Sequence, residues 1–137
     1  MSPDKALHLS VGAVIERDGK YLLIDRAKPP YGFASIAGHI EENETAEQAL
    51  AREIAEESGL TLVRHEKIFE EVMNRYSCDR GVSIHRWHVY ACEVSGTVKR
   101  SQRETKSIGW YSKEEIARLE LEPVWKHWFN KMNIITA

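Results

Sequence analysis

The chain has 137 residues, of which 42% are hydrophobic and 29% charged, so we expect one domain over residues 1–137 with a packed core. Its net charge of −2 argues against non-specific nucleic-acid binding, and no nucleic-acid partner is expected. No run of about 18 apolar residues and no signal-peptide pattern is present, which predicts a cytoplasmic protein without a membrane span.

The first part of the chain predicts a β-hairpin, a loop and a short strand. Residues 7–17 and 20–26 are strand-like, and Asp18-Gly19 between them is a turn signal. Residues 28–32 must form a loop, because their two prolines cannot donate to a strand ladder. A short strand near residues 33–37 follows.

Residues 45–58 have the pattern of a helix with a defined beginning and end. Thr45 and Gln48 have the spacing of a capping box, in which each side chain bonds the other residue's backbone N–H. Gly59 suits the left-handed position that ends a helix.

The rest of the chain predicts strands at residues 60–76, 82–94 and 107–111, then a helical segment from 113 to 132 that Pro123 interrupts. Apolar side chains in that segment fall at helical spacing and are expected to pack in the core, namely Trp125, Trp128, Phe129 and Met132. Strands dominate and helices are few, which favours the α+β class, with helices packed on both sides of a sheet in an α/β/α sandwich.

The predicted helix and the loop before it carry most of the negative charge. Residues 41–57 contain seven acidic residues and one basic residue, Arg52, so this segment carries −6 and the rest of the chain +4. On a helix that advances about 100° per residue, Glu53, Glu56 and Glu57 fall within one sector, beside the apolar stripe. These carboxylates are therefore predicted to lie partly buried.

Neighbouring carboxylates in such a position repel one another. Two of them about 4 Å apart repel by roughly 4 kcal/mol at an effective dielectric near 20. A raised pKa, a basic partner or a cation relieves that cost, and Arg52 compensates one charge at most. A hard divalent cation with oxygen ligands accounts for the rest, and Mg²⁺ is the leading candidate, with Mn²⁺ as a substitute.

Residues 38–60 read G-x5-E-x7-R-E-I-A-E-E-S-G-L, which resembles the Nudix box at every fixed position. The resemblance implies a Nudix fold with a mixed sheet, in which the box forms a loop, a helix and a second loop. Two departures occur nearby. Ile36-Ala37 precedes Gly38 where many members have Pro-Gly, and Asn43 replaces a common Gly just before the first box Glu. Asn tolerates the left-handed conformation, so the loop is expected to survive.

The resemblance also implies an activity and roles for individual residues. Nudix enzymes hydrolyse a nucleoside diphosphate linked to another group, by attack of water on phosphorus. By position, the metal ligands are Glu53, Glu56 and Glu57, helped by the main-chain carbonyl near Gly38. Arg52 is expected to orient the carboxylates by charge-assisted hydrogen bonds, and Glu44 to support the loop or bind a cation through water.

The general base has two candidates under this resemblance. Glu53 lies in the box, and Glu104 lies in the predicted loop six residues before Trp110. An exposed loop acid without a role is the alternative interpretation of Glu104, and the residues leave this choice open.

The group carried on the diphosphate needs an aromatic or apolar wall. Tyr31, Phe33, Tyr76 and Trp87 are the candidates, and ordinary packing is the alternative for each. His85 and His88, three apart on a predicted strand, are expected to face opposite sides of the sheet, which disfavours a metal shared between them.

Two functions from different classes remain open at this point. The first is a metal-dependent diphosphohydrolase acting on a small-molecule nucleotide or diphosphate substrate. The second is a non-catalytic nucleotide-binding or sensor domain on the same fold, although all box acids are present. Whether the chain forms a homodimer is not specified by the residues.

Overall fold

The computed structural model describes residues 7–73, 84–101 and 105–136. The elements in these residues run in chain order as follows: β1 (His8–Arg17), β2 (Lys20–Arg26), β3 (Phe33–Ala34), β4 (Ile36–His39), α1 (Ala46–Ser58), β5 (Thr61–Met73), β6 (His85–Ser95), β7 (Thr105–Tyr111), α2 (Lys113–Ile116) and α3 (Pro123–Lys131). No helix in the described ranges has the length and apolar character that crossing a membrane requires.

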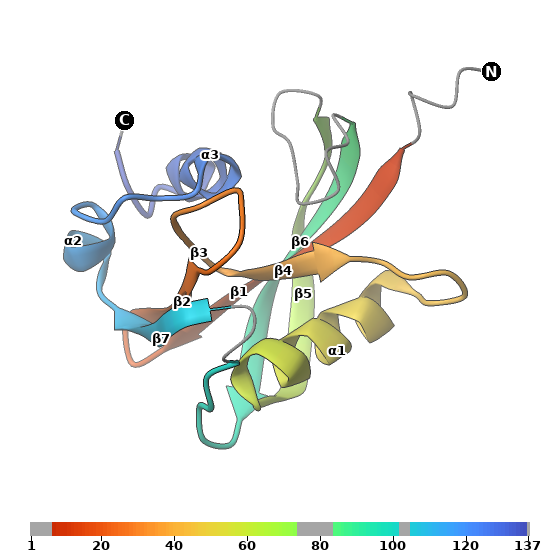
Figure 1. The fold of residues 1–137 in the computed structure, drawn as a ribbon, viewed down its shortest axis with the longest axis horizontal. Coiled ribbons are helices and arrows are strands. Elements are labelled where there is room, and N and C mark those ends of the chain that lie inside the picture. Colours follow the sequence, from red (N-terminus) through yellow and green to blue (C-terminus); the bar gives the residue numbers. More distant parts are fainter. Residues whose placement is uncertain (1–6, 74–83, 102–104, 137) are drawn as a thin grey trace.

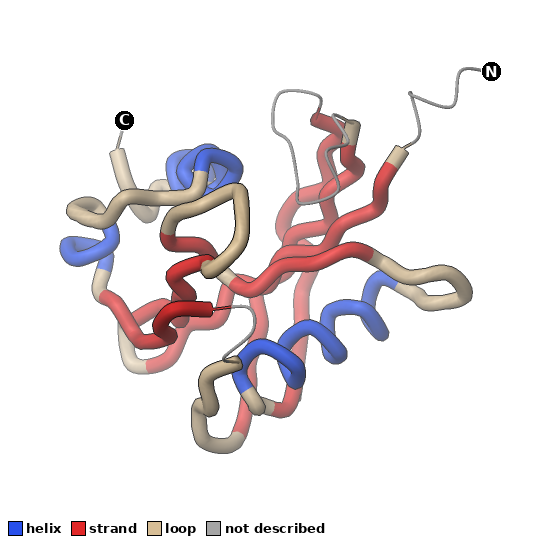
Figure 2. The backbone as a smooth tube through the Cα atoms, in the orientation of Figure 1, coloured by secondary structure: helices blue, strands red, loops and turns tan. Residues whose placement is uncertain are grey.

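The strands form a mixed sheet with β1 at its centre. The strand order is β3-β2-β1-β6-β5, with β4 also paired to β1 and β7 to β2. Strands β1 and β6 run parallel, and the other pairs are antiparallel. Helices α1 and α3 lie on opposite sides of the strands (Figures 1 and 2), which confirms the expected α+β class.

Alternation along β1 separates the two faces of the sheet. Val11 pairs with Gly38 of β4, and paired residues point to the same side of the sheet. A Cβ built on Gly38 would run into the Glu53 side chain of α1, so we call the side to which Val11 and Gly38 point the α1 face. The next residue, Gly12, faces the other way, since a Cβ there would meet the Trp125 ring of α3 at 2.8 Å. We call this second side the α3 face.

Helix α3 closes the α3 face with aromatic side chains. Trp125, Trp128 and Phe129 are fully buried, and Trp128 stacks on Phe69 of β5 with ring centroids 5.7 Å apart. Pro123 occupies the first turn, where its missing N–H costs nothing. The predicted core role is confirmed for these three side chains, while Met132, just after the helix, is half-buried and packs against the core.

The observed strands differ from the predicted ones near the Nudix box. The strand expected over residues 33–37 is split at Ser35 into β3 and β4, and β4 continues through Gly38 to His39. The extension follows from pairing with β1, in which Ser10 lies opposite His39. The turn expected near residues 78–81 lies outside the described residues.

A methyl group at Gly12 is expected to destabilise the fold. Gly12→Ala forces its Cβ against the buried Trp125 ring, and overpacking of this kind lowers the free energy of unfolding by roughly 1–3 kcal/mol. Gly109→Ala in β7 is the matched control, because its Cβ would lie 3.6 Å from the nearest atom, an ordinary contact. Urea unfolding measures both, and equal effects would contradict the argument.

Candidate active site

The loop before α1 is held in shape by its own backbone and by Glu44. The Glu41 N–H donates to the Glu44 carboxylate at 2.8 Å, and the Glu44 N–H donates to the Glu41 carbonyl at 3.2 Å. Asn43 between them has φ of 65°, the left-handed conformation that Asn tolerates. The replacement of Gly by Asn is therefore accommodated.

Helix α1 begins and ends where its capping residues predict. Thr45 and Gln48 form both bonds of the capping box, at 3.1 and 2.9 Å. Gly59 has φ of 74° and its N–H donates to the Ala55 carbonyl. These local contacts fix which helix residues face the sheet.

Arg52 connects the helix, the preceding loop and β4. Its Nε and Nη2 donate to the two oxygens of Glu44 at 2.8 and 3.0 Å, and Nη2 also donates to the His39 carbonyl at 2.9 Å. Its Nη1 donates to Glu53 at 2.8 Å and reaches Glu56 at 3.4 Å. The Arg52 hydrogen bonds lower the pKa of Glu44 to about 2, so Glu44 stays ionised at neutral pH.

Glu53 lies directly against the backbone of β4. A Cβ built on Gly38 would overlap the Glu53 carboxyl group, so only a glycine leaves space for this side chain. Burial raises the pKa of Glu53 to about 7, while the neighbouring Arg52 charge opposes that rise.

Glu57 and Glu56 complete the carboxylate cluster of Glu53, Glu56 and Glu57. Glu57 is only 5% exposed and shares a hydrogen bond with Glu53, whereas the Glu56 side chain is 57% exposed. The expected partial burial therefore holds for Glu53 and Glu57 but not for Glu56, which is exposed.

The donor set of this site fits a hard divalent cation. Arg52 pairs with Glu53 and Glu56, and Glu57 shares a hydrogen bond with Glu53, so one positive charge stands against three acids. Buried carboxylates hold a proton or a cation, and oxygen-only ligands suit Mg²⁺ or Mn²⁺. The assignment of Glu53, Glu56 and Glu57, with the Gly38 carbonyl, as the ligands of such an ion stays a prediction.

A hydrogen bond that the sequence did not indicate fastens α1 to the sheet. The buried Tyr90 hydroxyl of β6 donates to Glu47 of α1 at 2.8 Å. Burial and this bond raise the pKa of Tyr90. No local sequence signal reveals a contact between residues 43 positions apart.

Of the aromatic candidates, the three that the structure describes do not gather around the carboxylates. Tyr31 is 59% exposed, with the Lys106 ammonium 5.4 Å from its ring, and Phe33 packs edge-on against Tyr111. Trp87 lies on the α3 face, edge-on to Trp125 and Trp128. Tyr76 and the base candidate Glu104 lie outside the described residues. A substrate role for these residues therefore stays a prediction.

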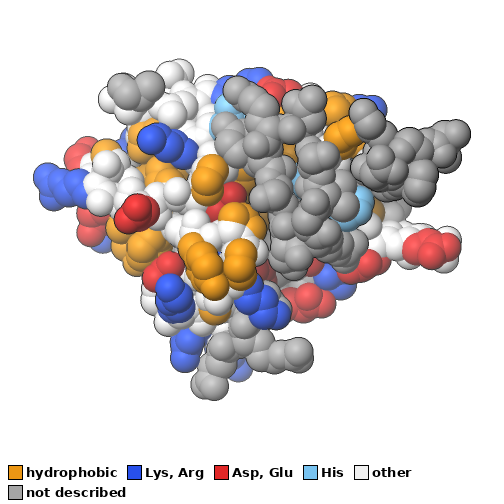
Figure 3. Space-filling model, turned by 45° about the horizontal axis from the view of Figure 1, so that its top comes forward, with side chains coloured by type: hydrophobic (Ala, Val, Ile, Leu, Met, Phe, Trp, Pro, Cys, Tyr) orange, Lys and Arg blue, Asp and Glu red, His pale blue; other side chains and the backbone are white. Residues whose placement is uncertain are grey.

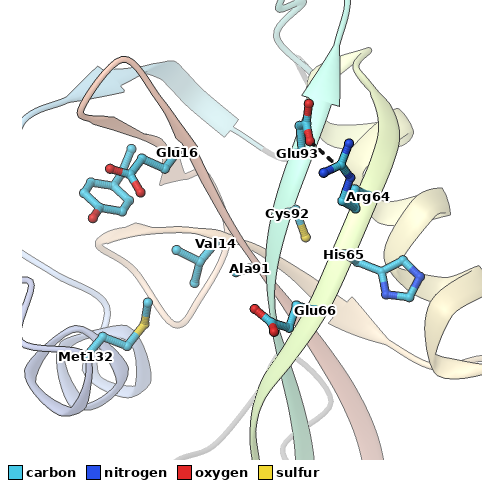
Figure 4. Close-up of a pocket in the computed structure, with 10 residues that line it drawn as sticks. Val14, Glu16, Arg64, His65, Glu66, Ala91, Cys92, Glu93 and Met132 are labelled. Carbon is cyan, nitrogen blue, oxygen red and sulfur yellow. Dashed lines mark ion pairs between the residues drawn. The ribbon is translucent and has the colours of Figure 1, made fainter.

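A cavity of about 600 Å³ opens elsewhere on the molecule (Figure 4). Its walls come from β1, β2, β5, β6 and Met132, and Arg64 pairs with Glu93 at its rim. None of the lining residues belongs to α1 or β4. The cavity is therefore separate from the carboxylate cluster.

Comparison with known proteins identifies the family. A model of the NUDIX domain matches residues 6–132. The CTP pyrophosphohydrolase of Escherichia coli (strain K12) is 34% identical over 116 residues, covering 82% of each chain. This chain therefore belongs to the NUDIX family, and its expected class, a Nudix-type pyrophosphohydrolase enzyme, is confirmed.

Solved structures agree on the fold. A MutT NUDIX hydrolase from Burkholderia pseudomallei has a TM-score of 0.77 at 24% identity, over 89% of this chain and 95% of that one. The NUDIX domain of Shewanella oneidensis NrtR complexed with ADP ribose has a TM-score of 0.79 at 21% identity, over 97% and 92%. At these identities the likeness is one of fold alone, and the predicted Nudix fold is confirmed.

The buried acid Glu53 predicts how stability depends on pH without metal. The pKa of Glu53 is about 7 in the folded state and 4.5 ordinarily, so the folded state binds the proton more tightly than the unfolded state does. The free energy of unfolding therefore falls as the pH rises from 4.5 to about 7, by up to roughly 3 kcal/mol. Urea unfolding in chelator should show this fall, and Mg²⁺ should reduce it.

Glu53→Gln is the variant that isolates this contribution. Burial also raises the pKa of Glu122, the residue that caps α3, to about 7, so some pH dependence should remain in the variant. A variant whose stability falls as steeply with pH as that of the parent would contradict the assignment to Glu53.

Proposed function

We propose that this chain is a divalent-metal-dependent hydrolase that cleaves a diphosphate linkage in a nucleotide or nucleoside diphosphate derivative. The observation that carries the proposal is the carboxylate cluster of Glu53, Glu56 and Glu57, tied by Arg52 to the loop and to β4. The relative described as a CTP pyrophosphohydrolase supports a nucleotide substrate.

The metal and the protein have separate tasks in this reaction. A bound Mg²⁺ neutralises phosphate oxygens and lowers the pKa of water. Glu53, Glu56 and Glu57 would hold the ion, and Arg52 keeps two of these carboxylates oriented by donating hydrogen bonds to them. Gly38, which has no Cβ, leaves the space beside β4 that the Glu53 carboxyl group occupies.

The general base is Glu53 or Glu104. The pKa of about 7 lets Glu53 accept a proton near neutral pH, and its hydrogen bond to Arg52 fixes its orientation. The support for Glu104 is its position in the chain, shortly before β7.

The first experiment is a substrate panel that includes CTP and ADP-ribose, with Mg²⁺, with Mn²⁺ and with chelator. We expect release of a monophosphate product only with a divalent ion. Glu57→Gln should lower kcat by at least roughly 100-fold, because the buried carboxylate no longer holds the cation. Glu114→Gln on the exposed surface of α2 is the control and should leave kcat unchanged.

Circular dichroism of Glu57→Gln should match the parent. Activity that persists in chelator, or in this variant, would count against the proposal. Tight nucleotide binding without any product after long incubation would favour the non-catalytic sensor instead.

The pH profile of kcat distinguishes the two base candidates. If Glu53 is the base, Glu53→Gln should lose the rise in kcat on the acidic side of the profile and its kcat should fall by roughly 100-fold or more, while Glu104→Gln keeps that rise. If Glu104 is the base, the two variants should behave the other way round. The comparison uses Glu53→Gln and Glu104→Gln. Because Glu53 is also an expected metal ligand, each profile is measured at saturating Mg²⁺ and at several Mg²⁺ concentrations.

A further inference from the structure

Three histidines from three different strands meet on the α3 face. They are His8 of β1, His39 of β4 and His85 of β6, and their ligand nitrogens lie within 4.8 Å of one another. The ring centroids are 5.2 Å apart for His8 and His39, 5.6 Å for His8 and His85, and 6.0 Å for His39 and His85. We call this group the histidine cluster.

Strand register brings the cluster together. His8 and His85 are direct neighbours in the parallel pairing of β1 with β6. His39 lies opposite Ser10, two residues along β1 from His8 and on the same face. Because sheet hydrogen bonds hold the three backbones, the Cβ positions of the three histidines are fixed before any ligand arrives.

The imidazoles of the cluster are suited to act as electron-pair donors. His85 is 3% exposed, and within the described residues Nδ1 of His8 and Nε2 of His85 are buried without a hydrogen-bond partner. Such buried polar atoms are costly unless something binds them. Burial, and secondly His8, lowers the pKa of His85, which favours the neutral imidazole that binds metals.

From this geometry we propose that His8, His39 and His85 bind a divalent transition ion of the zinc class. Zinc binds imidazole nitrogen at about 2.0–2.1 Å, which in tetrahedral geometry separates two ligand nitrogens by about 3.4 Å. The observed ligand nitrogens lie within 4.8 Å of one another, so the rings must move closer together to reach that spacing. Three protein ligands leave a fourth position for water or another small ligand.

This site is distinct from the carboxylate cluster in position and in chemistry. Gly38 faces α1 and Glu53, whereas the next residue of β4, His39, faces the other side of the sheet. Nitrogen ligands select zinc-class ions, and oxygen ligands select Mg²⁺. His8 and His39 are only half-buried, so the cluster is partly accessible from outside. Figure 3 shows that some histidine side chains reach the surface on the face it draws.

The two sites are connected through one peptide. The His39 carbonyl accepts the hydrogen bond of Arg52 Nη2 at 2.9 Å, so an ion on the His39 ring restrains the backbone that anchors Arg52. The zinc-class ion would therefore have a structural effect on the carboxylate cluster without being one of its ions.

Zinc titration of the untagged full chain tests the site. The protein is freed of metal with chelator and titrated calorimetrically with Zn²⁺ in excess Mg²⁺. We expect one zinc per chain, and a tetrahedral nitrogen-type absorption spectrum with Co²⁺ as the probe. His85→Ala and His8→Ala should each weaken zinc binding by more than about 100-fold. His65→Ala, an exposed histidine outside the cluster, is the control.

His85 is buried, so His85→Ala could fail to fold, and circular dichroism would reveal such a failure. His8 is only half-buried, so His8→Ala then carries the test. Unchanged zinc affinity in His8→Ala, or no zinc bound by the parent, would overturn the proposal. Loss of zinc binding in a Glu56→Gln, Glu57→Gln double variant would also overturn it, because the zinc would then occupy the carboxylate cluster. Retained zinc binding in that variant supports the histidine cluster even if no hydrolase activity is found.

Discussion

The guanidinium group of Arg52 is the contact on which the arrangement around α1 depends. It donates to a loop acid, a strand carbonyl and two helix acids, so one side chain sets the distance between three segments. Because it is planar and permanently charged, it holds the Glu44 carboxylate with two parallel hydrogen bonds. A lysine would supply the charge without this geometry. Arg52 therefore holds the loop before α1 through Glu44, and it holds Glu53 in place beside Gly38.

The buried acids show where stability and function conflict. Leu50 and Ile54 of α1 are fully buried, as a helix packed on a sheet requires. Glu57 of the same helix is also buried, although its side chain is acidic. An apolar side chain at Glu57 would pack without an electrostatic penalty. A buried acid costs stability unless a proton, a basic partner or a cation compensates its charge.

Local features were predictable from the sequence, and non-local ones were not. The capping box at Thr45, the left-handed Gly59 and the hairpin turn at Asp18 depend on neighbouring residues, and each was confirmed. The sector containing Glu53 and Glu57 follows from helical periodicity. The extension of β4, the Tyr90 bond and the histidine cluster depend on strand register, which pairs residues far apart in the chain.

The central place of β1 has a consequence for how the chain tolerates insertions and deletions. The strand pairs with β4 along one edge and with β6 along the other, and its alternating residues serve both faces. Loss of a single residue within it would reverse the direction of every side chain beyond that point. Val11 would then exchange faces with Gly12, and one change would disturb helix packing and the histidine cluster together. Length changes are therefore expected to accumulate in the loops, while β1 keeps a fixed length.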